Sequence, residues 1–414
     1  MPLISSGKRD KRKAVMGSQA MPFWKVLTLL SGLAILMPLV IDIFLPAIPA
    51  IAQSFQVSTG DIQITLASLN LGAAIGQLLY GPLADRFGRR WVIIVSMSIF
   101  SISGFATAAA PNLEWLNILR FVQGLTAASG MIIIRAIVRD LYDGALAAKM
   151  LAYTFVAGSI MPIAAPIIGG NVTVWLGWQP NFYIIGGIGV LVFLSLWRWL
   201  DETGEKDYDA IRFQLVWSSF VRISRSRVFL TYAYVGIGPF AGLFAILTAL
   251  SSTLIEFMGV SPTIFGYLFA LIMLGNLTAS IVAGRLVSSI GGVPLIYSGC
   301  VICLVSGLAA GGFAWMGIVT PAGIVIPSLG FMIGFALLVP AATAGAMSPF
   351  PKMAGRASSL IGLVHHSAGA ITSLLVGLMA DGTHIPLVWS LIICGIFSFL
   401  SIWPVCKLKH EQGL

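Results

Sequence analysis

Long apolar stretches, separated by glycine, proline and charged residues, recur twelve times along the sequence. Each is about 20 to 25 residues long, which is the length that a helix needs to cross a bilayer. They begin near Val26, Ile62, Trp91, Leu113, Lys149, Asn181, Val228, Thr263, Pro294, Ala322, Ala357 and Pro386. Only 9% of the 414 residues are charged and the mean hydropathy is +0.96, which excludes a soluble domain with a solvated shell. The pattern predicts an all-α membrane protein with twelve transmembrane helices.

Charged and nearly uncharged connections alternate between these stretches. The charged ones fall at 81–90, 139–149, 201–227, 285–293 and 348–356. Every Lys and Arg except Arg120 lies in a tail, in a charged connection or at an adjoining helix end. The positive-inside rule therefore predicts that both termini are cytoplasmic. Topology explains the net charge of +9, so no nucleic-acid partner is expected.

A weak internal repeat divides the chain into two halves. An offset of 203 residues aligns Val57-Ser58 with Val260-Ser261, and Gly88 with Gly291. We expect a basic cytoplasmic tail at 1–24, a six-helix bundle at 25–200, a cytoplasmic linker at 201–227, a second bundle at 228–406 and a tail at 407–414. The tail at 1–24 lacks a signal-peptide cleavage site. The basic linker stretch 212–227 is expected to lie on the inner membrane surface.

The first charged connection, Gly81-Pro-Leu-Ala-Asp85-Arg86-Phe-Gly88-Arg89-Arg90, carries an acid and three arginines after a Gly-Pro pair that favours a tight turn. It resembles the signature loop of the major facilitator superfamily. The resemblance implies two six-helix bundles and a conformational latch. In that latch Asp85 lies near a helix N-terminus of the opposite half, and the arginines lie near an acid such as Asp140. The alternative is that the arginines act only as topology signals. In the second half, Ser288 replaces the acid and Gly292 an arginine.

Three further segments narrow the resemblance. Arg120-Phe-Val-Gln123-Gly124 resembles the drug-exporter motif of the superfamily, and Ile41-Asp42-Ile-Phe-Leu-Pro46 resembles the Bcr/CflA drug:proton antiporters. The antiporter motif is matched at Pro162, Pro166, Gly169 and Gly170, with Ala165 where that motif favours glycine. These prolines remove helix hydrogen bonds and the glycines let another helix approach, which predicts a bend. The resemblance implies a monomeric exporter in the bacterial inner membrane, without a cofactor or metal and not an enzyme.

Asp42 is the one acid well inside an apolar stretch, and Arg120 is the one base. Counted along their helices, both lie roughly 10–12 Å below the surface opposite the charged connections, so their depths allow contact. A lone carboxyl in this setting either pairs or takes up a proton. We therefore expect the two residues to couple substrate movement to protons. A static buried ion pair is the alternative.

Other residues are candidates for the substrate pathway. Arg135 either reaches it or serves as a snorkelling anchor. His365 and His366 point about 100° apart, so at most one faces the pathway squarely. Polar Gln63, Asn70, Gln77 and Asn276 fit either pathway lining or bonds between helices. The remaining candidates are Phe44, Gln123, Tyr153, Tyr234 and Phe240.

These residues predict a secondary transporter that exchanges amphipathic small molecules or drugs for protons, with lipid as its surroundings. One alternative keeps the fold but exports a single metabolite, such as an amino acid or a nucleoside. Another is a channel or sensor in which Asp42 and Arg120 are structural. No nucleotide-binding or metal-binding motif lies in a suitable context, and the four cysteines fall in apolar runs.

Overall fold

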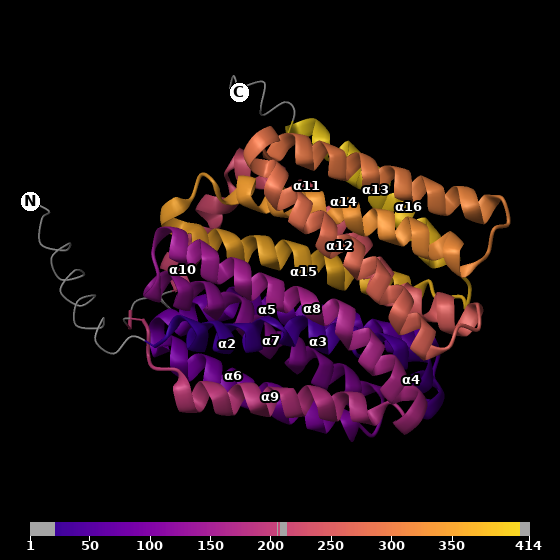
Figure 1. Ribbon diagram of the computed structural model, residues 1–414, viewed down its shortest axis with the longest axis horizontal. Coiled ribbons are helices and arrows are strands. Elements are labelled where there is room, and N and C mark those ends of the chain that lie inside the picture. The colour runs from indigo at the N-terminus through magenta and orange to yellow at the C-terminus, as the bar shows by residue number, and fades with distance from the viewer. Residues whose placement is uncertain (1–20, 205, 208–212, 406–414) are drawn as a thin grey trace, which may run out of the picture.

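The computed structural model describes residues 21–204, 206–207 and 213–405 and contains twelve helical spans within them (Figure 1). The predicted tails therefore lie almost wholly outside the described residues. The spans after the first are α5 (Thr59–Phe87), α6 (Arg89–Ala108), α7 (Leu113–Leu141), α8 (Gly144–Leu176), α9 (Gln179–Trp199), α11 (Arg227–Ser251), α12 (Pro262–Ile290), α13 (Gly292–Trp315), α14 (Pro321–Met347), α15 (Ala354–Leu378) and α16 (Ile385–Leu400). Several are longer than predicted because the helix continues past the apolar run into the charged turns.

The first span is broken rather than continuous. It comprises α2 (Phe23–Ala34), α3 (Leu36–Asp42), a short 3-10 turn (Leu45–Ala47) and α4 (Ile48–Phe55). Prolines in this span remove helix hydrogen bonds, and Pro46 and Pro49 occupy first-turn positions where a missing N–H is tolerated. The span ends later than predicted, so Asp42 lies nearer to its middle.

The internal repeat is visible in the helix boundaries. Helices α5 and α12 both contain 29 residues, and their first and last residues differ by the predicted offset of 203. Ser58 and Ser261 cap their N-termini, and each side chain accepts a backbone N–H three residues on. Gly88 and Gly291 end them with φ of +97° and +80°, a conformation that favours glycine.

The two halves lie side by side, indigo to magenta and orange to yellow in Figure 1. Helix α5 of the first half packs along α15 of the second, and α8 packs on α12. The linker contains helix α10 (Phe213–Ser224), which packs on α11 and α15. We call the end of the molecule with the charged connections the basic end. The opposite end, whose connections include 56–58, 258–261 and 379–384, is the acidic end.

Candidate functional site

Asp42 is the last residue of α3 and is buried, with 4% of its surface exposed. Among the described residues it has no hydrogen-bond or ion-pair partner. A buried carboxylate without a partner is costly, because nothing replaces the water that it has lost. The state described here therefore does not compensate a charge at Asp42 with a neighbouring cation.

Arg120 is completely buried in α7 and is fixed by other contacts. Its Nη1 donates to the Val40 carbonyl oxygen at 2.8 Å and to Gln123 Oε1 at 3.0 Å. The guanidinium lies over the Phe44 ring, 4.4 Å from its centroid, and its Nε and Nη2 atoms have no partner among the described residues. Gln123 in turn donates to Thr107 Oγ1 at 3.1 Å. Cation–π contact and a charge-assisted hydrogen bond thus stabilise the cation.

Arg120 and Asp42 lie at similar depths, because the arginine binds the carbonyl two residues before the acid. They do not form an ion pair, so the static-pair alternative is wrong for this state. Depth along a helix does not fix rotation around it, and the backbone carbonyl and aromatic face of the first span hold the guanidinium instead.

A row of polar side chains on α5 faces the second half. Gln63, Asn70 and Gln77 are seven residues apart, so they share one face of the helix, and all three are buried. Gln63 donates to Ser252 Oγ at 2.7 Å, and the backbone at Gly362 packs against Gln77. We call Gln63, Asn70 and Gln77 the polar row. By contrast Asn276 donates to the Met332 carbonyl within the second half, which is a bond between helices.

The two histidines of α15 point in different directions. His366 reaches the first half and donates from Nδ1 to Asn70 Oδ1 at 3.2 Å, an orientation fixed because Asn70 Nδ2 donates to the Leu66 carbonyl. His365 stays within its own half and stacks on Phe240, with 4.0 Å between ring centroids. His366 therefore lies at the boundary between the halves, whereas His365 packs against Phe240 within the second half.

The other pathway candidates separate into different locations. Arg135 donates to Ser358 Oγ of α15, so it lies between the halves and does not anchor the protein in lipid. Tyr153 packs with Phe23 and stacks on Trp24 at the basic end of the first half. Tyr234 contacts the Phe397 ring and lines a shallow apolar cavity. The structure does not bring Tyr153 or Tyr234 together with Asp42.

The signature segment forms a compact charged cluster at the basic end. Arg89, almost fully buried, contacts Asp140 through Nε at 2.9 Å and Asp85 through Nη2 at 2.8 Å. The predicted contact between an arginine and Asp140 is therefore present. Arg86 lies over the Phe87 ring, and Arg90 donates to the Trp197 carbonyl. Among the described residues, no helix terminus of the second half binds the Asp85 carboxylate.

The backbone around the signature segment differs from the prediction. Helix α5 continues through Gly81 and Pro82 to Phe87, so the expected Gly-Pro turn is wrong. The chain turns at Gly88 instead, whose positive φ suits a residue without a Cβ. The proline is tolerated because α5 can lose one bond near its end.

Glu202, which the sequence did not single out, completes this cluster. Its Oε1 accepts the backbone N–H of Arg89 at 2.8 Å, and Oε2 accepts that of Arg90 at 3.3 Å. It therefore binds the N-terminus of α6, where a negative charge is favourable. A Cβ at Gly88 would overlap the Glu202 carboxylate, so glycine is also needed for this approach.

Two substitutions compare Asp140, whose side chain is 16% exposed, with the more exposed Asp85. Asp140→Asn should lower the unfolding free energy by about 1–3 kcal/mol, because it leaves the buried Arg89 cation poorly compensated. Asp85→Asn should cost less than about 1 kcal/mol, because the Asp85 side chain is 44% exposed. Thermal unfolding of the purified protein in detergent measures both. Equal losses of unfolding free energy in the two variants would contradict the expectation that the Arg89–Asp140 pair stabilises the protein more than the Arg89–Asp85 pair.

The antiporter-motif glycines allow two close helix contacts. A Cβ on Gly169 would overlap the backbone carbonyl of Ile43 in the first span, and one on Gly170 would overlap that of Pro262 in α12. The predicted close packing is therefore present. It occurs on two sides of α8, within the first half and across the boundary. Pro162 and Pro166 both lie inside α8.

Paired repeats of six spans, with a buried acid and a polar boundary between them, define a multi-pass membrane transporter. The chain belongs to the major facilitator superfamily, whose family model matches residues 30–373. It is 30% identical to the bicyclomycin resistance protein homolog of Haemophilus influenzae, over 94% of this chain and 97% of that one. It is 27% identical to multidrug resistance protein D of Escherichia coli, over 90% and 93%.

Solved structures agree on the fold. The bacterial homolog of the lysosomal transporter Spinster, in an inward-facing conformation, has a TM-score of 0.73 at 17% identity, over 94% of this chain and 98% of that one. The xylose transporter XylE from E. coli, partially occluded and inward open, has a TM-score of 0.74 at 16% identity, over 93% and 97%. At these identities the likeness concerns architecture alone.

Proposed function

We propose that the protein exports amphipathic small molecules or drugs in exchange for protons, with Asp42 as the proton carrier. The single observation that carries the proposal is the Asp42 carboxyl, which is buried in the first span without a partner among the described residues. The relatives support the export of drugs, because several are named for resistance to bicyclomycin, chloramphenicol or many drugs. The antiporter-motif match on α8 supports exchange.

The proposed orientation places the basic end in the cytoplasm of a bacterium and the acidic end outside its inner membrane. The distribution of Lys and Arg supports this orientation. Both termini are then cytoplasmic, and the linker with α10 lies at the inner surface. We propose a monomer, since each chain contains both halves of the pathway.

The coupling chemistry requires Asp42 to alternate between a protonated and a charged form. A proton from outside binds the carboxyl when substrate has left, and it departs to the cytoplasm when the pathway opens inward. Burial favours the neutral form, and in the proposed cycle Arg120 favours the charged form when the two side chains approach each other. If substrate and proton exclude each other, inward proton flow drives substrate outward. One proton moving down about one pH unit and about 100 mV supplies roughly 3.7 kcal/mol, enough for a gradient of a few hundredfold for a neutral substrate.

Transport in membrane vesicles tests the proposal. Purified protein in vesicles with an imposed proton gradient should concentrate unrelated cations and phenicols, and an uncoupler should abolish the uphill movement. A narrow requirement for one amino acid or nucleoside would favour a dedicated metabolite exporter. Passive flux that ignores the gradient would favour a channel and would contradict exchange.

The charged cluster at the basic end is proposed as the conformational latch. Asp85→Asn should slow the transport of every substrate alike, because the latch acts on opening and closing and does not contact the substrate. Initial rates for a cation and a phenicol measure this effect. A defect confined to one of them would contradict the latch role.

A further inference from the structure

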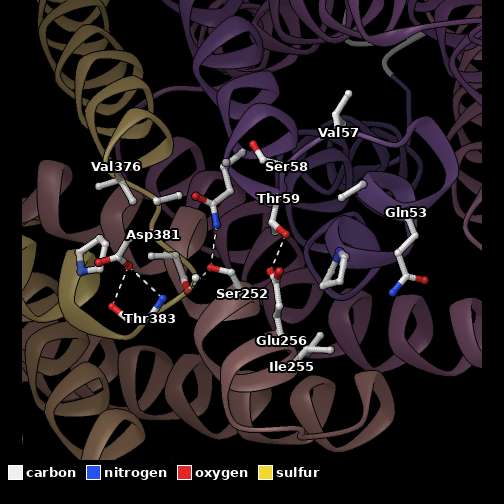
Figure 2. Close-up of a pocket in the computed structure, with 18 of the residues that line it drawn as sticks. Gln53, Val57, Ser58, Thr59, Ser252, Ile255, Glu256, Val376, Asp381 and Thr383 are labelled. Carbon is white, nitrogen blue, oxygen red and sulfur yellow. Dashed lines mark hydrogen bonds between the residues drawn. The ribbon is translucent and has the colours of Figure 1, made fainter.

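A cavity of about 770 Å³ lies at the acidic end, where the two halves meet (Figure 2). Its walls come from α4, the first turns of α5, the end of the seventh span, and the connection between α15 and α16. A volume of this size is typical of pockets for drug-sized molecules. We call this cavity the vestibule. It contains neither Asp42 nor Arg120.

The charged side chains that line the vestibule have one sign, and His384 lies near Asp381 but outside the lining. Glu256 and Asp381 line the vestibule, and none of its lining residues is Lys or Arg. The sequence places no Lys or Arg in the other connections at this end. A cleft with a single sign of charge and low-dielectric walls focuses the field and concentrates counter-ions. The vestibule therefore attracts cations and repels anions.

The polar atoms that line the vestibule include acceptors with free capacity, which favours a ligand with N–H donors. Gln63 is 1% exposed, its Nε2 is occupied by Ser252 Oγ, and its Oε1 has no partner among the described residues. A buried acceptor without a partner destabilises the protein, and a ligand donor that reaches it would remove this cost. Glu256 Oε2 accepts from Thr59 Oγ1 at 2.5 Å across the boundary and keeps further acceptor capacity. Figure 2 shows Glu256 and Asp381 on different sides of Ser252.

Asp381 remains charged in mildly acidic surroundings. Its Oδ1 accepts from Thr383 Oγ1 at 2.7 Å and from the Thr383 backbone N–H at 2.9 Å. These hydrogen bonds stabilise the carboxylate and lower the pKa of Asp381 below its ordinary value. Pro49, Ile255 and Val376 add apolar surface to the lining.

We propose that the vestibule is a second binding site, selective for amphipathic amines in their protonated form. The ammonium group approaches the carboxylates of Glu256 and Asp381, an N–H donates to Gln63 Oε1, and the apolar body packs on the apolar part of the lining. The vestibule does not include Asp42, so a result that disproves amine binding there would leave the proposal of proton-coupled export unchanged. If export runs as proposed, the vestibule holds amines on their way out.

Binding of quinacrine, a fluorescent protonated amine, to the purified full-length protein tests the proposal. The double variant Asp381→Asn/Glu256→Gln should weaken quinacrine binding at least about tenfold, as the loss of two charged acceptors predicts. Neutral chloramphenicol should compete poorly for this site. Glu114→Gln is the matched control, because Glu114 is an exposed acid at the start of α7, at the same end but outside the vestibule.

The single variant Asp381→Asn guards against a folding defect, because asparagine keeps an oxygen for Thr383 and the hydrogen bonds of Asp381 with Thr383 do not cross the boundary. It should weaken binding by several fold with an unchanged melting temperature. Unchanged affinity in both variants would overturn the proposal. So would an equal loss in Glu114→Gln, which would indicate general surface charge, or complete loss in Asp42→Asn, which would place the amine at the central carboxyl.

Discussion

Asp42→Asn is expected to abolish uphill export while the protein still folds and still binds substrate. Asparagine has nearly the same shape as aspartic acid but cannot carry a proton between the two sides. The gradient that vesicles sustain should fall from a few hundredfold to about one, because the roughly 3.7 kcal/mol per proton is no longer coupled to the substrate. Accumulation of a labelled substrate under an imposed proton gradient measures the effect.

Glu114→Gln removes one acid at the surface of the acidic end and is the control. It should leave the accumulated gradient unchanged. Facilitated exchange of substrate for substrate should survive in Asp42→Asn, since it needs no net proton movement. Wild-type accumulation with the same pH dependence in Asp42→Asn would show that protons are carried elsewhere.

Substitution by valine at the adjacent Gly169 and Gly170 is expected to affect different properties: stability at Gly169 and transport at Gly170. In Gly169→Val the new side chain meets the Ile43 carbonyl. Both residues belong to the first half, so we expect this contact to persist when the halves separate. We expect a loss of about 1–3 kcal/mol in the unfolding free energy through overpacking. Melting in detergent measures it.

In Gly170→Val the new side chain meets the Pro262 carbonyl of the other half, so separating the halves at the acidic end relieves the overlap. Stability should change little, whereas transport should fall below about a tenth of wild type because this end cannot close. The thiol that Gln63→Cys introduces at this buried position should then react faster with an impermeant maleimide in the Gly170→Val background than in the wild-type background. Equal destabilisation by both valines would show that the halves do not separate there.

The sequence predicts most strongly those features that depend on a run or a spacing. Twelve spans follow from the length of apolar runs, and the matched ends of α5 and α12 follow from one register of glycines and serines. The contact between Arg89 and Asp140 was expected from the resemblance and is present. Such features are local in the sequence or recur at a fixed spacing. They can therefore be predicted without knowledge of contacts between distant residues.

Features that depend on rotation or on distant contacts were not predictable. The count of residues along a helix gave Asp42 and Arg120 similar depths, but it did not show that the guanidinium binds the Val40 carbonyl. The two histidines of α15 are adjacent, and only packing decides that His366 contacts Asn70. Glu202 belongs to no motif and reaches Arg89 only through the tertiary fold.

The polar row of α5 has an energetic consequence for alternation. The seam between the halves must open in each cycle, and at Gln63 and Asn70 it is joined by hydrogen bonds to Ser252 and His366. Water can take over such bonds as the seam wets, at little enthalpic cost, whereas an aliphatic seam would have to expose hydrocarbon. We therefore expect hydration of this strip to keep the two conformations close in free energy, which the proposed exchange driven by one proton requires.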